Sequence, residues 1–501
     1  MSYQQYLSCI SALNDQFRYY KTLESLFEQD QWAALPQEGG AYRQQVAAHI
    51  AQQKAGLFFG EDARAAAEYF AGADLGSMED EVERGLIRTF LFRYRNARRT
   101  PAKLTRQYSM LRADAMNAWR LAREKEDFQI FRPRLEQVFS LKKQIALAID
   151  PDAPAFDTLV GLTDEGTGCT EISQEFEILS QGLNRLLRRI QNSPVRPDLA
   201  LLSQEEDPAR MESFARRLAR ESGLSADRSS FDNRVVHGFT SFMGPRDARI
   251  STPRNRTLSL VFTYLHEAGH AMYASGGNDR VNAANMWGGI EGGFHEAMAR
   301  FNENMVGRSR AYWEHYYPQL QQEFPSFRGI SLDRFYLAMN AVRPSLKRIA
   351  ADEVTYSLHV ILRYELERDY FSGQLAVDEM EERWNELSEK YLGLRPANAT
   401  QGILQDMHWA GDYIGYFQSY ALGNLYGGQL LEAVHRELPD LDTQLAQGCF
   451  DKLNVWLDKN VRQYGCCFTA GQLSEKISGK RLDARPFLRY LEEKYTALYQ
   501  L

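Results

Sequence analysis

The most restrictive feature of this chain is a pair of histidines four residues apart, in His266-Glu267-Ala268-Gly269-His270. The run 257–273 around them has apolar residues at helical spacing, and Gly276-Gly277 follows it, which predicts a helix that stops at these glycines. Residues four apart lie on one face of a helix, so both imidazoles can bind one metal ion. The pattern predicts a zinc site with Glu267 beside it, an arrangement typical of metal-dependent peptide hydrolysis.

A catalytic zinc needs a third protein ligand and one open position. Glu296 is the first candidate, because the segment 292–304 looks helical and the Gly- and Asn-rich stretch before it lets the chain return to the first helix. Glu291, which lies among glycines, and His295 are rivals. The alternative to a metal site is a helix whose histidines only form hydrogen bonds with neighbouring groups.

Composition excludes several other classes of protein. The chain has 501 residues with a net charge of −7, which argues against general nucleic-acid binding. Its 5 cysteines show neither zinc-ribbon spacing nor a disulfide framework, so a reducing compartment is expected. The N-terminus lacks the pattern of a signal peptide and no apolar run is long enough to span a membrane. A cytoplasmic protein is therefore expected.

Amphipathic periodicity predicts a mostly α fold. Helices are expected over 86–99, 102–126, 131–149, 175–191, 209–221, 332–340, about 345–369 and 379–391. The stretch 234–250, just before the metal-site helix, has a strand-like pattern and predicts a small sheet. We expect residues 1–501 to form one multi-lobed domain, with a helical scaffold or lid over 1–230 and a catalytic region over 231–501.

Six ordered motifs resemble those of the carboxypeptidase Taq family of zinc metallocarboxypeptidases. The similarity is strong over about 231–430. Before and at the metal site, His237-Gly-Phe239 corresponds to the family's His-Pro-Phe, Asp247-Ala-Arg-Ile-Ser251 to its Asp-x-Arg-x-Thr, and the metal-site helix to its own. After it, His295-Glu-Ala-Met298 corresponds to His-Glu-Ser-Gln, Arg348-Ile-Ala-Ala-Asp352 to Arg-x-x-Ala-Asp, and Gly402 to Trp409 to Gly-x-x-Gln-Asp-x-His-Trp. Departures from the family pattern stand at Gly238, Ser251, Ala297, Met298 and Lys347.

The resemblance implies a large helical zinc-peptidase fold with a deep substrate groove, and a homodimer. It implies one zinc ion per chain, with cobalt as an alternative, and Glu296 as the third ligand. The implied activity is the release of C-terminal residues from peptides with broad specificity. No nucleic-acid or membrane partner is expected.

Glu267 is the expected general base, because it can take a proton from a metal-activated water and pass it to the leaving amine. The developing oxyanion needs a donor, and Tyr420 and His408 lie in segments that resemble the family. Tyr420 could instead be a packed helix tyrosine, and His408 could orient a carboxylate.

Recognition of a free C-terminal carboxylate suits the forked guanidinium of arginine. The resemblance points to Arg348, with Arg249 as the second choice, although either could form a structural ion pair. Asp352, four residues after Arg348, suggests a helical ion pair. His237 is expected either to contact substrate or to be a turn residue.

Two other functions remain open. A thimet-like oligopeptidase, which cuts inside short peptides, shares the metal-site helix and the distant glutamate. A catalytically silent helical binding protein would keep the metal as a relict or structural element.

Overall fold

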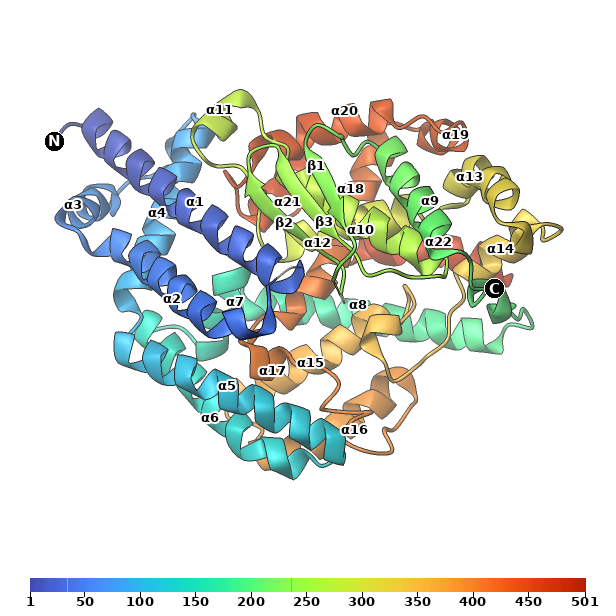
Figure 1. Ribbon diagram of the computed structural model, residues 1–501, viewed down its shortest axis with the longest axis horizontal. Helices are drawn as coiled ribbons and strands as arrows, with labels where there is room; N and C mark the ends of the chain where they lie inside the picture. The colour runs from blue at the N-terminus through green and yellow to red at the C-terminus, as the bar shows by residue number, and fades with distance from the viewer. Residues whose placement is uncertain (34, 236) are drawn as a thin grey trace.

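The computed structural model describes residues 1–33, 35–235 and 237–501, and the chain is mostly helical with one small sheet (Figure 1). The predicted fold class is therefore confirmed. The helices before the sheet are α1 (Tyr3–Ala33), α2 (Gly40–Gly56), α3 (Glu61–Phe70), α4 (Glu81–Arg99), α5 (Ala102–Lys125), α6 (Phe128–Ile149), α7 (Ala155–Thr163), α8 (Cys169–Asn192) and α9 (Pro208–Glu221).

The helices after the sheet carry the predicted site. They are α10 (Ser259–Ala274), α11 (Asp279–Ala283), α12 (Gly293–Arg300), the π-helical segment η5 (Phe301–Val306), α13 (Arg310–Glu323), α14 (Leu332–Met339), the 3₁₀ turn η7 (Arg348–Ala350), α15 (Tyr356–Phe371), α16 (Met380–Leu392), α17 (His408–Gly411), α18 (Phe417–Glu437), α19 (Leu441–Ala446), α20 (Asp451–Asn460), α21 (Ala470–Ser478) and α22 (Arg485–Tyr499).

Local signals explain where several helices begin. Asp80 accepts hydrogen bonds from the backbone N–H groups of Val82 and Glu83 at the start of α4, which is the usual role of an N-cap aspartate. Asp207 caps α9 in the same way, and Pro208 occupies its first turn, where the missing N–H of proline costs no helical bond.

The sheet has the strand order β1–β3–β2, with β1 (Ser229–Asp232) parallel and β2 (Phe239–Gly244) antiparallel to β3 (Asp247–Ser251). The predicted strand region contains β2 and almost all of β3, whereas β1 lies upstream of it, and Val236 lies outside the described residues. Gln29 of α1 donates to the Ser251 hydroxyl at 2.8 Å and accepts from the Ser241 hydroxyl at 3.0 Å. The N-terminal helix is thereby attached to the sheet.

The predicted helix over 345–369 is wrong in its first half, because α15 begins at Tyr356. Asp352 accepts the backbone N–H groups of Val354 and Thr355, both at 3.0 Å. This side-chain capping closes the turn before α15 and leaves the residues before it in a loop.

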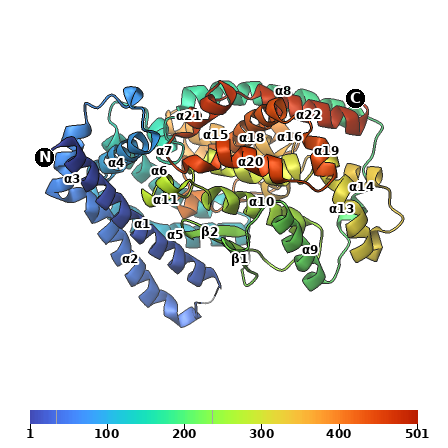
Figure 2. The same ribbon diagram turned by 90° about the horizontal axis from the view of Figure 1, so that it is seen from above.

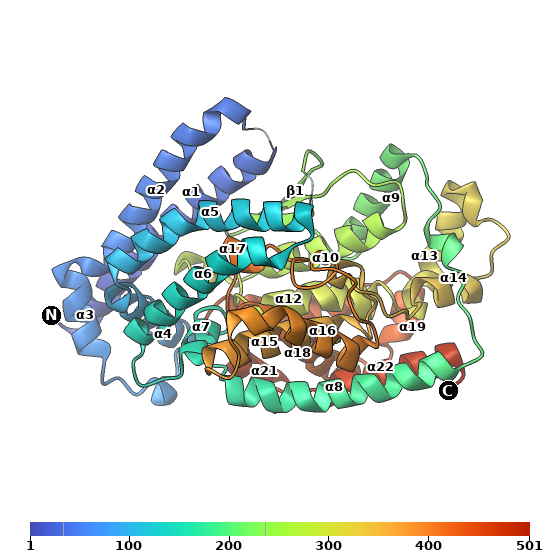
Figure 3. The same ribbon diagram turned by 90° about the horizontal axis from the view of Figure 1, so that it is seen from below.

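The site helices lie at the centre of the molecule. Views from above and below place α1 and α2 at one end, α13 and α14 at the other, and α10 between them (Figures 2 and 3), and the view from below also shows α12 there (Figure 3). α18 packs against α12, α15 and α22, and most of its side chains are buried. Across the described residues, no helix combines the length and apolarity needed to cross a bilayer. The division of the chain near residue 230 stays a prediction.

Candidate active site

The two site helices touch closely because small residues meet between them. A Cβ atom at Gly269 of α10 would lie 2.6 Å from the Met298 carbonyl oxygen and 2.7 Å from the Ala299 Cα. On the other side of α12, a Cβ at Gly423 of α18 would lie 2.6 Å from Cγ of Glu296. Only glycine permits these approaches. α12 therefore packs tightly between α10 and α18, and Glu296 points toward the two histidines.

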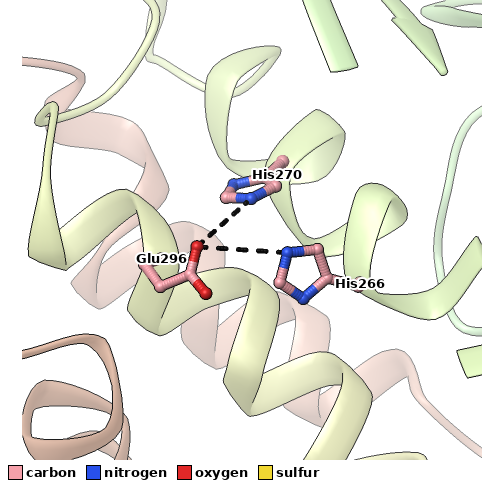
Figure 4. A group of neighbouring side chains, drawn as sticks. All are labelled: His266, His270 and Glu296. Carbon is pink, nitrogen blue, oxygen red and sulfur yellow. Dashed lines mark ion pairs between the residues drawn. The ribbon is translucent and has the colours of Figure 1, made fainter. Parts of the chain in front are cut away.

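His266, His270 and Glu296 form a compact group (Figure 4). Glu296 Oε2 lies 4.0 Å from His266 Nε2 and 3.8 Å from His270 Nε2, and the three ligand atoms fall within 4.8 Å of one another. Tetrahedral zinc ligands at their usual bond lengths are about 3.4 Å apart, so small side-chain shifts would complete a site. Two nitrogens and one carboxylate oxygen are also the donor types that a catalytic zinc takes.

Glu291 and His295, the other candidates for the third metal ligand, do not belong to this group. Glu291 is exposed; the charge of Lys21, followed by that of Arg18, lowers the pKa of its carboxyl despite desolvation. His295 Nδ1 lies 2.7 Å from His270 Nδ1, on the side of that imidazole opposite Nε2. Burial lowers the pKa of His295 to about 4, which keeps this ring neutral at ordinary pH.

Glu267 lies between α10 and the sheet. It is buried, and its Oε2 accepts a hydrogen bond of 2.7 Å from the Thr240 hydroxyl on β2. Burial raises the pKa of Glu267, and this effect outweighs the nearby positive charge and the hydrogen bond, so the carboxylate has more affinity for a proton than an exposed one. A Cβ at Gly238 would lie 2.9 Å from Thr263 Cγ2 and 3.3 Å from Glu267 Oε1. This departure from the family pattern thus lies directly against Glu267.

A second cluster surrounds the Arg348 side chain. Its Nε and Nη2 donate to Asp406 Oδ1 at 3.1 and 2.8 Å, and its Nη1 donates to the Tyr356 hydroxyl at 3.1 Å. Arg363 Nε donates to the other oxygen of Asp406 at 2.6 Å. The predicted helical pair of Arg348 with Asp352 is therefore wrong, because Arg348 lies in a 3₁₀ turn and binds a residue 58 positions away.

Tyr420 and His408 come together beside this cluster. His408 Nε2 lies 3.1 Å from the Tyr420 hydroxyl, and the Arg348 guanidinium lies 4.9 Å from the Tyr420 ring centre. Burial lowers the pKa of His408 to about 3, and burial raises the pKa of Tyr420. A neutral imidazole can accept from the hydroxyl or donate to it, depending on its tautomer.

A cavity of 1140 Å³ lies beside both clusters, because its lining includes Arg300 and Glu303, which contact Glu296 and His266, together with Arg348, Tyr356 and Asp406. Arg300 Nε donates to Glu296 Oε1 at 2.8 Å, and its guanidinium lies 4.1 Å from the Tyr356 ring centre. Since Tyr356 also accepts from Arg348, one continuous set of contacts leads from Glu296 to Arg348.

Comparison with known proteins identifies the family. The model of the carboxypeptidase Taq (M32) metallopeptidases matches residues 10–495. This chain belongs to the M32 family. A thermostable carboxypeptidase 1 from Thermus thermophilus is 36% identical over 430 residues, 82% of this chain and 83% of that protein. Carboxypeptidase 1 from Bacillus subtilis is 32% identical over 411 residues, 81% of this chain and 82% of that protein. The crystal structure of an M32 carboxypeptidase from Deinococcus radiodurans has a TM-score of 0.92 at 31% identity and covers 100% of this chain and 99% of its own.

M32 membership confirms the family predicted from the motifs and makes the chain a metallocarboxypeptidase, a hydrolase that uses a metal ion. Within the described residues, His266, His270 and Glu296 are the one group of histidine, cysteine and acidic side chains with ligand atoms close enough to bind a metal.

Arg249 and His237, the other predicted substrate residues, lie on or next to the sheet. Arg249 is on β3, where its Nη2 lies 3.2 Å from Asp247 Oδ2 on the same strand. His237 is exposed, before β2. The structure therefore favours an ion pair for Arg249, and substrate contact by His237 stays a prediction.

Four residues in or beside the candidate site were missed in the sequence. Arg300 and Glu303 follow Glu296 by four and seven residues, a helical spacing that could have been noticed. Asp406 stands inside a recognised motif, next to Gln405. Thr240 had no signal, because its contact with Glu267 spans 27 residues and depends on how the sheet packs against α10.

We predict that Asp406→Asn lowers the free energy of unfolding by about 3 kcal/mol, because it leaves two buried guanidiniums without their carboxylate. Arg363 is fully buried and Arg348 is 8% exposed. These two charges lower the pKa of Asp406 even though desolvation opposes them. Its stabilising contribution is therefore present above the unfolded pKa of about 4 and is lost as the pH falls below it.

Urea unfolding at pH 7 and at pH 3 measures this effect. The difference between the natural protein and Asp406→Asn should shrink at the lower pH, and Asp333→Asn, at an exposed ion pair with Arg310, should have no measurable effect. Equal stability of the natural protein and Asp406→Asn at pH 7 would contradict the prediction.

Proposed function

We propose that this M32 protein releases C-terminal amino acids from peptides one at a time, with a metal ion bound by His266, His270 and Glu296. The observation that carries the proposal is the convergence of these three side chains within 4.8 Å, next to a cavity lined by Arg348. We propose zinc as the ion, with cobalt as an alternative, one per chain.

A divalent ion held by these three side chains would polarise the scissile carbonyl and acidify a water molecule. Glu267 would accept a proton from water and deliver it to the leaving amine. The Thr240 hydroxyl, at 2.7 Å, holds the carboxylate in place. Tyr420, with its hydroxyl oriented by His408, is the proposed donor to the developing oxyanion.

Arg348 is the proposed anchor of the substrate carboxylate. A guanidinium has five N–H groups, and three of those of Arg348 are used by Asp406 and Tyr356. One N–H on each terminal nitrogen therefore remains for the two oxygens of a carboxylate. The contacts through Arg300 and Tyr356 keep this group close to Glu296.

We propose broad specificity because the cavity is large. Its volume of 1140 Å³ exceeds the range of roughly 300–1,000 Å³ that is typical of small-ligand pockets, so a terminal side chain of any size would fit. The same volume supports a second candidate function, the oligopeptidase, since more than one residue could extend beyond the metal. Homodimer formation and a cytoplasmic location stay predictions.

A peptide ladder tests the proposal. We expect purified protein to shorten a ten-residue peptide by single residues from its C-terminus, to lose this activity with a chelator, and to recover it when Zn²⁺ is added. Mass spectrometry of the products at early times decides between the candidates, because internal fragments would indicate an oligopeptidase. No cleavage by the zinc-loaded protein would support a silent binding protein.

A further inference from the structure

One helical segment carries a hydrogen-bonding partner for each proposed metal ligand. It runs from Gly293 to Val306 through α12 and η5, and it also supplies Glu296 itself. Arg300 donates to Glu296, Glu303 binds His266, and His295 binds His270. Each contact uses the ring nitrogen or carboxylate oxygen that points away from the other two ligand residues. His266 Nε2, His270 Nε2 and Glu296 Oε2 are therefore left free to bind one metal ion.

Glu303 binds His266 through a short contact, 3.0 Å from its Oε2 to the imidazole Nδ1. Two guanidiniums also approach this carboxyl group, Arg300 Nη1 at 3.7 Å from its Oε2 and Arg308 Nη2 at 3.5 Å from its Oε1, and they favour its charged form. A carboxylate that accepts from Nδ1 places the imidazole proton there and leaves Nε2 with its lone pair for a metal.

The π-helical geometry of η5 supports a site-building role for this segment. Asn302 donates its side-chain N–H to the Leu265 carbonyl of α10 at 2.6 Å, immediately before His266. Single π-helical turns occur often at functional sites. The turn here joins the segment to the backbone of the metal-site helix and brings Glu303 to the outer side of His266.

The partner of His270 is a neutral imidazole and not a carboxylate. Only one proton can lie between the two Nδ1 atoms, which are 2.7 Å apart. If His270 Nε2 binds a metal, that proton belongs to His270 Nδ1, and His295 Nδ1 must accept it. His295 then carries its own proton on Nε2, a buried atom that forms no hydrogen bond with the described residues. The ring is held by Phe242 and Tyr273, each with its ring centre 5.1 Å away.

We propose that Glu303 and His295 are unequal positioning residues for the metal: Glu303 orients His266 and adds a negative charge, whereas His295 orients His270 without adding charge. The inference rests on the proposed metal site. It predicts that both residues increase metal affinity. It also predicts that a charged partner contributes to this affinity only beside His266, where the partner is Glu303.

Matched variants separate orientation from charge. Glu303→Gln keeps an acceptor for His266 without the charge, and Glu303→Met removes both at similar length. His295→Asn keeps an acceptor close to the position of Nδ1, and His295→Phe retains a ring between Phe242 and Tyr273 without an acceptor. Glu314→Gln, at an exposed residue of α13, is the control.

The readout is the Zn²⁺ dissociation constant, measured by competition with a chromogenic chelator, together with the unfolding temperature of each metal-free protein. We expect His295→Phe and Glu303→Met to bind zinc about 10- to 100-fold more weakly, Glu303→Gln to be weakened measurably, and His295→Asn to stay within about threefold of the natural protein. The metal-free proteins should unfold at similar temperatures, because the effect concerns the ion.

Zinc affinities within threefold of the natural value in both His295→Phe and Glu303→Met would overturn the inference while leaving the metal site intact. Equal losses of zinc affinity in His295→Asn and His295→Phe would overturn the role of His295 as a hydrogen-bond acceptor for His270. If one variant does not fold, the pair at the other position makes the same comparison. A natural protein that binds no zinc would instead overturn the proposed function.

Discussion

Glu267→Gln is expected to lower kcat/KM for a peptide with a free C-terminus by about 10³-fold, with one metal ion still bound per chain. Glutamine preserves the size of the side chain and can still accept from Thr240, whose hydroxyl lies 2.7 Å from Glu267 Oε2. It cannot take a proton from water at neutral pH. Steady-state kinetics and elemental analysis of the same sample measure both quantities.

The combination of lost activity and retained metal separates a general base from a ligand. His270→Ala should lose both, because it removes a proposed ligand atom. Glu314→Gln, on the exposed face of α13, should change neither. If Glu267→Gln kept more than a tenth of the natural activity, Glu267 would not be the base.

Arg348→Lys is the second large effect, with an expected loss of about 100-fold in kcat/KM for a peptide with a free C-terminus. Lysine keeps the positive charge opposite Asp406 but lacks the fork that can hold Asp406 and a substrate carboxylate together. The natural protein should discriminate against the same peptide with an amidated C-terminus, and Arg348→Lys should lose most of this discrimination.

The ratio of the two rates is the decisive measurement, because a general loss of stability would reduce both rates alike. Arg343→Lys is the matched control, since Arg343 lines the same cavity but is exposed, and its ratio should equal that of the natural protein. Equal cleavage of free and amidated peptides by the natural protein would reject the carboxypeptidase and favour the oligopeptidase.

The metal-site helix shows why part of the site is readable in the sequence. Helical spacing brings His266 and His270 to one face, and this relation holds wherever the helix packs. The stop signals after it were also correct, since α10 ends at Ala274. For Glu296 the sequence gives only a ranking above Glu291 and His295, because its convergence on the histidines depends on the close packing permitted by Gly269 and Gly423.

The segment before α15 shows where local pattern reading fails. The periodicity over 345–369 was helical, but Asp352 caps the turn before Tyr356, and Arg348 binds Asp406 instead of a helical neighbour. The Asp352 carboxylate accepts backbone N–H groups at this turn, so Arg348 finds its carboxylate across the fold, in Asp406. Sequence spacing carries no information about such a partner.

By itself, the sequence determined the helical class, the small sheet before α10, the pair of histidines with Glu267 and the family, because these depend on periodicity and on short strings of residues. The tertiary structure alone decided which residues support the site: Thr240 beside Glu267, Glu303 and His295 behind the two histidines, and Asp406 beneath Arg348. The physical reason is that a hydrogen bond needs its donor and acceptor within about 3 Å, and for residues distant in the chain only the packing of helices and sheet sets that distance.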